Sequence, residues 1–155
     1  MRTINITGKP EIDTIIRQCT ICFLGLVGND GTPHVIPMNF GYEGNEIILH
    51  SKPDAKQVAL ATANNRVCVT FCTESKLVFQ HPDVACSYRM QAKSVVCKGN
   101  VSFIEALDEK EKALDILMRN YSGKEFKYSL PALANVKVWK VAVTEMTAKA
   151  FGQKP

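Results

Sequence analysis

A chain of 155 residues with 46% hydrophobic and 22% charged residues has the composition of one ordinary globular domain, and we expect a single domain over residues 1–155. This composition excludes a disordered or collagen-like chain, and no apolar run approaches the roughly 18 residues of a membrane-spanning helix. The net charge of +4 is spread without a basic block, so it suggests a small anionic ligand at least as readily as a nucleic acid. We expect neither a nucleic acid nor a membrane as a partner. The amino terminus lacks the continuous apolar core of a secretory signal, so the sequence predicts a soluble, cytoplasmic protein.

The pattern of apolar and turn-forming residues predicts many short strands and three short helices. Gly99 interrupts a long strand and predicts a bend or bulge, and Asp108 begins an Asp-x-x-Glu pattern that predicts a helix start. In chain order, we expect a helix at 11–18, strands at 21–27, 35–42 and 46–50, a helix at 54–63, strands at 67–73, 77–80 and 93–105, a helix at 108–121 and a strand at 136–143. Strands joined by frequent hairpin turns predict a mainly β fold, an antiparallel barrel that is closed or nearly closed.

The segment after the expected hairpin of 35–42 and 46–50 has residues typical of a phosphate site. The second strand ends at Ser51-Lys52-Pro53-Asp54, where Pro at a first-turn position and an alanine-rich run predict the start of a helix. Backbone N–H groups of the first turn would then face an anion together with Ser51, Lys52 and Lys56. The other interpretation is that both lysines only solvate a surface helix, since lysines are mostly exposed.

Six cysteines raise the question of a disulfide or a metal site, and their spacing argues against both. Cys68 and Cys72 lie on one expected strand about 13 Å apart, which is too far for a disulfide. Cys19 and Cys22 have the Cys-x-x-Cys spacing, but no second pair of ligands completes a zinc site. We therefore expect no metal, and we expect reduced thiols that pack as small hydrophobes.

The order of these segments resembles the FMN-binding split barrel of the pyridoxamine 5'-phosphate oxidase superfamily. The resemblance covers about residues 19–149 and is greatest to the nitroimidazole-resistance (Nim-like) and flavin-nucleotide-binding branch. It depends on five segments, which are residues 34–40 (HVIPMNF), 48–52 (ILHSK), 56–60 (KQVAL), 64–71 (NNRVCVTF) and 93–99 (KSVVCKG). The resemblance implies an antiparallel split barrel with short flanking helices, a homodimer, and FMN bound at the interface of the two chains, with FAD as the alternative cofactor.

The resemblance also assigns residues to that cofactor. Residues that would line the flavin ring are Pro37, Met38 and Asn39. Residues that would meet the ribityl phosphate or its neighbourhood are His50, Ser51 and Lys56, beside the Lys52 already nominated from the strand-to-helix pattern. The pair Lys93-Ser94 matches an Arg-Ser or Lys-Ser pair of the family. Two departures are Ala92, where the family often has an aromatic residue, and Lys93 itself, which lacks the bidentate fork of an arginine.

The function implied is a flavin-dependent reductase or oxidoreductase that acts on a small molecule, with nitroaromatic compounds as one substrate class. His50 is the candidate catalytic residue, because an imidazole near neutral pH could donate a proton or hold an anionic group; capping of a strand end is its alternative role. Three other functions stay open. They are a pyridoxamine 5'-phosphate oxidase, a non-catalytic flavin or haem carrier on the same barrel, and a nucleic-acid binder of the OB type, which would need exposed aromatic residues on a basic sheet face.

Overall fold

The computed structural model describes residues 2–153, which form nine strands and four α-helices. The strands are β1 (Arg2–Ile6), β2 (Cys22–Val27), β3 (Pro33–Met38), β4 (Gly41–Glu43), β5 (Glu46–Ser51), β6 (Arg66–Cys72), β7 (Lys76–Val78), β8 (Arg89–Ile104) and β9 (Lys137–Gln153). The helices are α1 (Lys9–Arg17), α2 (Lys56–Ala63), α3 (Leu107–Tyr121) and α4 (Leu130–Ala134), with one 3-10 turn at Ala85–Ser87. The prediction of a mainly antiparallel β fold with short flanking helices is therefore confirmed.

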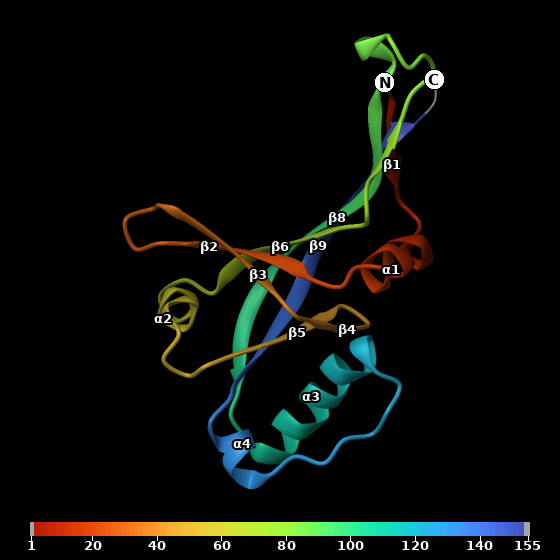
Figure 1. The fold of residues 1–155 in the computed structure, drawn as a ribbon. Helices are drawn as coiled ribbons and strands as arrows, with labels where there is room; N and C mark the ends of the chain where they lie inside the picture. Colours follow the sequence, from red (N-terminus) through yellow and green to blue (C-terminus); the bar gives the residue numbers. More distant parts are fainter. Residues whose placement is uncertain (1, 154–155) are drawn as a thin grey trace.

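Two long strands, β8 and β9, form the axis of the molecule and pair along almost their whole length (Figure 1). The main sheet has the strand order β3-β2-β6-β8-β9-β5-β4, in which every pair is antiparallel. One end of the β8–β9 pair carries β1, β7 and both chain termini, and the other end leads into α3 and α4. In the described part of the chain, no helix is both long enough and apolar enough to cross a membrane.

The main core fills the interior of the sheet and contains Trp139, Phe40 and Phe71, all fully buried. The edge of the Phe40 ring packs on Phe71 at a centroid distance of 4.8 Å. A smaller core lies between α3, α4 and the outer face of β5 and β9, because Ile48 and Val138 point to the opposite side of the sheet. The two cores fix β5 from both sides, so its carboxyl end is rigidly placed.

The hairpin expected from 35–42 and 46–50 is present only next to its turn, where Gly41 and Tyr42 pair with Ile48 and Ile47. The structure divides the first run at Asn39-Phe40, so that β3 pairs with β2 and only the three residues of β4 pair with β5. The division follows from Phe40, whose ring enters the core and whose backbone N–H donates to the Tyr121 hydroxyl at 2.9 Å. Residues 37–39 consequently stand at a break between two sheet regions.

Other boundaries also differ from the sequence prediction. Helix α2 begins at Lys56 and not at residue 54, because Pro53 and Asp54 form a turn. Asp108 lies in the first turn of α3, but Ala106 is the N-cap residue and no side chain caps the helix. Strand β9 extends to Gln153, and β1 and α4 were not predicted. The bulge predicted at Gly99 is confirmed by a shift of the β8–β9 register after Lys98.

Candidate functional site

A cavity of about 500 Å³ lies where β3 and β5 end and α2 begins. Its volume is in the range of natural small-molecule sites. The residues that line it are Ile36, Pro37, Met38, Asn39, His50, Ser51, Lys52, Ala55 and Gln57. The structure thus brings together six of the nine residues that the sequence nominated for a cofactor, and we call this space the strand-end cavity.

One wall of the strand-end cavity comes from the carboxyl end of β3. Pro37 pairs with Phe23 of β2, and Met38 pairs with Cys22. Met38 is buried, whereas Pro37 and Asn39 are exposed. The wall therefore offers a proline ring and an amide side chain to a ligand, over a buried thioether.

The facing wall comes from the carboxyl end of β5. Leu49 points into the core, and the next two residues, His50 and Ser51, both line the cavity at the end of the strand. Alternation along the strand places His50 on the opposite face from Leu49 and Ser51 on the same side as Leu49. The Ser51 hydroxyl accepts a hydrogen bond from Trp139 Nε1 at 3.0 Å and donates one to the Lys52 carbonyl at 3.0 Å. Ser51 is therefore held in place by the core before any ligand arrives.

His50 is exposed to solvent at the cavity, yet the protein packed around its ring partly desolvates it. This burial lowers the pKa of His50 below its usual value, because desolvation disfavours the charged imidazolium. At neutral pH the ring is consequently neutral and carries one N–H donor and one acceptor. A permanent positive charge at this position, one of the roles considered from sequence, is thus disfavoured.

The beginning of α2 closes the third side of the strand-end cavity. Its N-cap is Ala55, which provides no side-chain hydrogen bond to the first turn. The Val58 N–H donates to the Ala55 carbonyl at 2.9 Å, so the N–H groups of Lys56 and Gln57 are the ones available to an anion. Lys52 lines the cavity, whereas Lys56 is the exposed first residue of the helix and is not one of the lining residues. Within residues 2–153 neither lysine is paired with a carboxylate.

Lys93 and Ser94 lie away from the strand-end cavity of the same chain. The Lys93 ammonium pairs with Glu11 at 2.8 Å and lines a different cavity, together with Gln18 and Thr73. Ser94 pairs with Cys72 in the middle of the sheet. The structure therefore does not bring these two residues to the other seven within one chain.

Three residues of the strand-end cavity were not predicted from the sequence, namely Ile36, Ala55 and Gln57. Ile36 directly precedes the nominated run 37–39, so its place in the sequence could have identified it as a cavity residue. Gln57 belongs to the first turn of α2, and nothing in its local sequence distinguishes it from a surface residue of a helix.

The cysteines do not contribute to this cavity. All six carry free thiols, and Cys19, Cys22 and Cys97 are buried. Burial raises the pKa of Cys22 and of Cys97 to about 12, so both thiols stay protonated and unreactive at neutral pH. Within residues 2–153, no group of three or more His, Cys, Asp or Glu side chains is arranged to hold a metal ion.

Comparison with known proteins identifies the family. A family model described as pyridoxamine 5'-phosphate oxidase matches residues 8–150, and the chain belongs to this family. Its strand order and short outer helices are those of the split barrel, so the predicted superfamily is confirmed. A search of curated proteins found no match.

A crystal structure from Bacteroides thetaiotaomicron, of a candidate 5-nitroimidazole antibiotic resistance protein, is 48% identical to this chain with a TM-score of 0.88. The alignment covers 96% of this chain and 87% of that one, which confirms the predicted likeness to the nitroimidazole-resistance branch.

Two more distant structures share the fold. The FAD- and haem-binding protein of Mycobacterium smegmatis is 18% identical with a TM-score of 0.85, over 97% of this chain and 75% of that one. A flavocytochrome of Azotobacter vinelandii is 17% identical with a TM-score of 0.83, over 97% and 71%. At these identities the likeness extends to the fold alone.

The strand-end cavity fits the group that this family implies. A flat, largely apolar ring system with an anionic tail needs an apolar wall at one end and positive potential at the other. Pro37, Met38 and Ile36 supply the first, and Lys52 with the uncapped start of α2 supplies the second. These residues could hold a flavin nucleotide with its ring at β3 and its phosphate at α2.

Proposed function

We propose that this protein binds FMN in the strand-end cavity and works as a flavin-dependent reductase of small molecules. The observation that carries the proposal is the meeting of Pro37-Met38-Asn39 with His50-Ser51-Lys52 at the start of α2. Membership of the pyridoxamine 5'-phosphate oxidase family supports it. FAD remains the alternative cofactor, because the same phosphate site could hold either nucleotide. The flavin, once bound, supplies the redox chemistry, and the chain supplies orientation and access.

Substitution of Lys52, at the proposed phosphate end of the site, tests where FMN binds. Lys52 lines the cavity without a carboxylate partner among the described residues, so its ammonium can donate to a phosphate. We expect Lys52→Ala to weaken FMN binding by about 1.5–3 kcal/mol, the scale of a hydrogen bond to a charged group. Lys112→Ala, a similar change on the exposed face of α3, is the control and should leave FMN affinity unchanged.

His50 has a defined part in this proposal. Its neutral ring lies on the cavity wall opposite Asn39, where its N–H can donate a hydrogen bond to a substrate stacked on the flavin. His50→Ala should then keep the cofactor bound and slow reoxidation by substrate about 10²-fold. An unchanged rate at full flavin occupancy would remove His50 from the active site and leave it a structural residue.

We also propose that the functional unit is a homodimer that shares the flavin. Lys93 and Ser94 resemble a cofactor-contacting pair of the family but lie away from the cavity of their own chain, so a second copy is needed for them to reach the phosphate. Dilution that separates the two chains should then release flavin. A fully loaded monomer in light scattering would contradict the shared site.

The substrate class proposed for the first assays is nitroaromatic compounds. The relative from B. thetaiotaomicron, described as a candidate 5-nitroimidazole resistance protein, suggests this choice. Purified, flavin-loaded protein should oxidise a reduced nicotinamide nucleotide when a nitroimidazole is added. Turnover with pyridoxamine 5'-phosphate instead would favour the oxidase, and a flavin that no substrate reoxidises, or a haem absorption band, would favour a carrier.

A further inference from the structure

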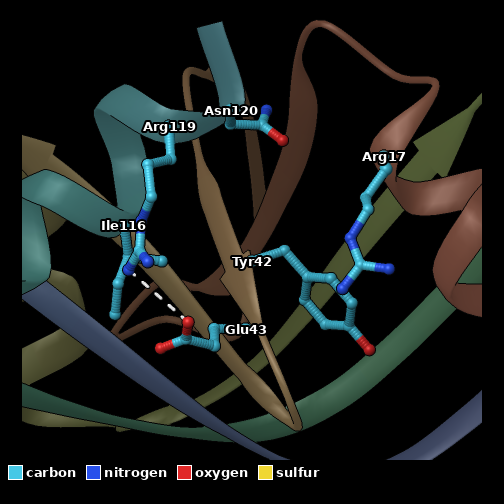
Figure 2. A pocket seen from close by; sticks show the side chains of 6 residues that line it. All are labelled: Arg17, Tyr42, Glu43, Ile116, Arg119 and Asn120. Atoms are coloured by element: carbon cyan, nitrogen blue, oxygen red, sulfur yellow. Dashed lines mark ion pairs between the residues drawn. The ribbon is translucent and has the colours of Figure 1, made fainter. Parts of the chain in front are cut away.

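A second cavity lies between the end of α1 and α3, and it shares no residue with the strand-end cavity. Its volume is about 360 Å³. Arg17, Tyr42, Glu43, Ile116, Arg119 and Asn120 line it. Figure 2 shows the Arg17 guanidinium beside the Tyr42 ring, with Arg119 paired to Glu43 on the other side. We call this space the arginine cavity.

Arg17 is the group in the arginine cavity without a partner. Its guanidinium carbon lies 5.9 Å from the centroid of the Tyr42 ring, and within residues 2–153 it forms neither an ion pair nor a side-chain hydrogen bond. Contact with the ring face orients the planar guanidinium and leaves the N–H donors at its edge free. Those donors can bind both oxygens of a carboxylate.

The Tyr42 side of the cavity is rigid and adds no negative charge. The Tyr42 hydroxyl donates to Asp13 at 2.6 Å and accepts from Lys9 at 2.8 Å, and Lys9 is also ion-paired with Asp13. Burial, followed by the Asp13 hydrogen bond, raises the pKa of Tyr42 to about 12, so the phenol is neutral at neutral pH. The Asp13 carboxylate is thus already bound by Lys9 and Tyr42, and it attracts Arg17 through space without a hydrogen bond or an ion pair.

On the α3 side of the arginine cavity, the net charge is close to zero. Arg119 is ion-paired with Glu43 at 3.4 Å, so their charges largely cancel. With Lys9 and Asp13 also paired, the cavity retains one positive charge, that of Arg17. Because these groups together carry one net positive charge, a bound monovalent anion would balance it, whereas a doubly charged phosphate would leave an excess of negative charge.

The volume and the apolar lining of the arginine cavity indicate that the anion has an apolar part. The cavity is roughly ten times the volume that one water molecule occupies in the liquid, so it exceeds the needs of a simple ion. Ile116, which is half-buried, and the small exposed part of the Tyr42 ring give this extra space an apolar surface. We propose that the arginine cavity binds an organic monocarboxylate, with its carboxylate on Arg17 and its apolar body against Tyr42 and Ile116.

Titration with benzoate, followed by calorimetry, tests this site. Arg17→Gln keeps the length of the side chain approximately and removes the charge, and it should weaken benzoate binding at least about tenfold. Arg66→Gln, at an exposed arginine of β6, is the matched control and should bind benzoate as the wild type does. No saturable binding to the wild type, or equal affinity in Arg17→Gln, would overturn the proposal.

A second variant, Glu43→Gln, should strengthen benzoate binding, whereas Arg17→Gln should weaken it. Glu43→Gln releases Arg119 from its ion pair and adds one positive charge to the cavity, so benzoate should bind several-fold more tightly and inorganic phosphate should begin to bind. Neutral benzyl alcohol should fail to compete with benzoate. Competition by benzyl alcohol at a similar concentration, or unchanged affinity for benzoate in Glu43→Gln, would contradict the proposed carboxylate site. FMN affinity in the same samples should stay constant, which separates this site from the proposed flavin site.

Discussion

The hydrogen bond between Trp139 and Ser51 joins the core to the strand-end cavity, and its removal is the most informative perturbation of the fold. Trp139 is fully buried, and its ring edge packs on Phe103 at a centroid distance of 5.1 Å. Its Nε1–H donates to the Ser51 hydroxyl at 3.0 Å. In Ser51→Ala the indole N–H keeps its buried position and loses its acceptor.

The cost follows from the desolvation of that N–H group. A buried donor without a partner costs about 1–3 kcal/mol of stability. A loss of about 2 kcal/mol corresponds to a fall in Tm of about 4–8 °C for a domain of this size. Ser51→Thr keeps the hydroxyl and should lose much less, and Ser102→Ala, at an exposed serine of β8, should be nearly neutral.

Urea unfolding followed by tryptophan fluorescence measures this effect directly. The chain contains a single tryptophan, so the whole fluorescence signal comes from Trp139, the residue that donates to Ser51. The unfolding midpoint of Ser51→Ala should fall with an unchanged slope. A free energy of unfolding within about 0.5 kcal/mol of the wild type, the usual range for neutral surface changes, would refute the role given to this hydrogen bond.

Three further changes test other parts of the structure. Gly41→Ala would place a Cβ 2.5 Å from the backbone of α3 and should destabilise the protein by about 2–3 kcal/mol in urea unfolding, whereas Gly8→Ala meets no atom within 4 Å and should be tolerated. Lys110→Met leaves two backbone carbonyls near α4 without the ammonium that donates to them at 2.9 and 3.1 Å, so it should cost about 1–3 kcal/mol; equal stability would contradict this. The lowered pKa of His50 means that the unfolded chain binds its proton more readily, so wild-type stability should fall relative to His50→Gln as pH decreases from about 7 to about 5, and parallel pH profiles would be inconsistent with it.

Local patterns were sufficient to predict much of this fold. The helix expected at 108–121 agrees with α3, because the apolar spacing that includes Leu114 and Leu117 places both in the smaller core. Gly99 marks the bulge because a side chain there would collide with the Ala142 carbonyl oxygen, 2.4 Å from the position of its Cβ. Trp139 lies in the strand expected at 136–143 and is fully buried.

Pairings that depend on distant residues could not be predicted from local sequence. The division of 35–42 into β3 and β4 depends on Phe40, which is fixed by Phe71 and by the Tyr121 hydroxyl from the end of α3. The late part of β9 was missed because it has few β-branched residues, although Ala148 and Ala150 alternate inward.

The candidate site shows the same contrast. Residues 37–39 and 50–52 converge because each group ends a strand at the same side of the sheet. The strand-to-helix pattern was enough to nominate Ser51 and Lys52, whereas residues 37–39 were nominated by the family resemblance. Lys93 was nominated by resemblance alone, and its place beside Glu11 depends on how α1 packs against β8 and β6. Tertiary packing of this kind leaves no mark in the residues around Lys93.

Titration of the flavin-free apoprotein with FMN tests the central claim most directly. Binding is measured by the quenching of flavin fluorescence and by the visible absorption of the bound cofactor. The proposal predicts saturable binding to the wild type and weaker binding to Lys52→Ala, with Lys112→Ala equal to the wild type. Absence of FMN and FAD binding to the wild type, or FMN affinity that is the same in all three proteins, would contradict the account of the strand-end cavity as a flavin site.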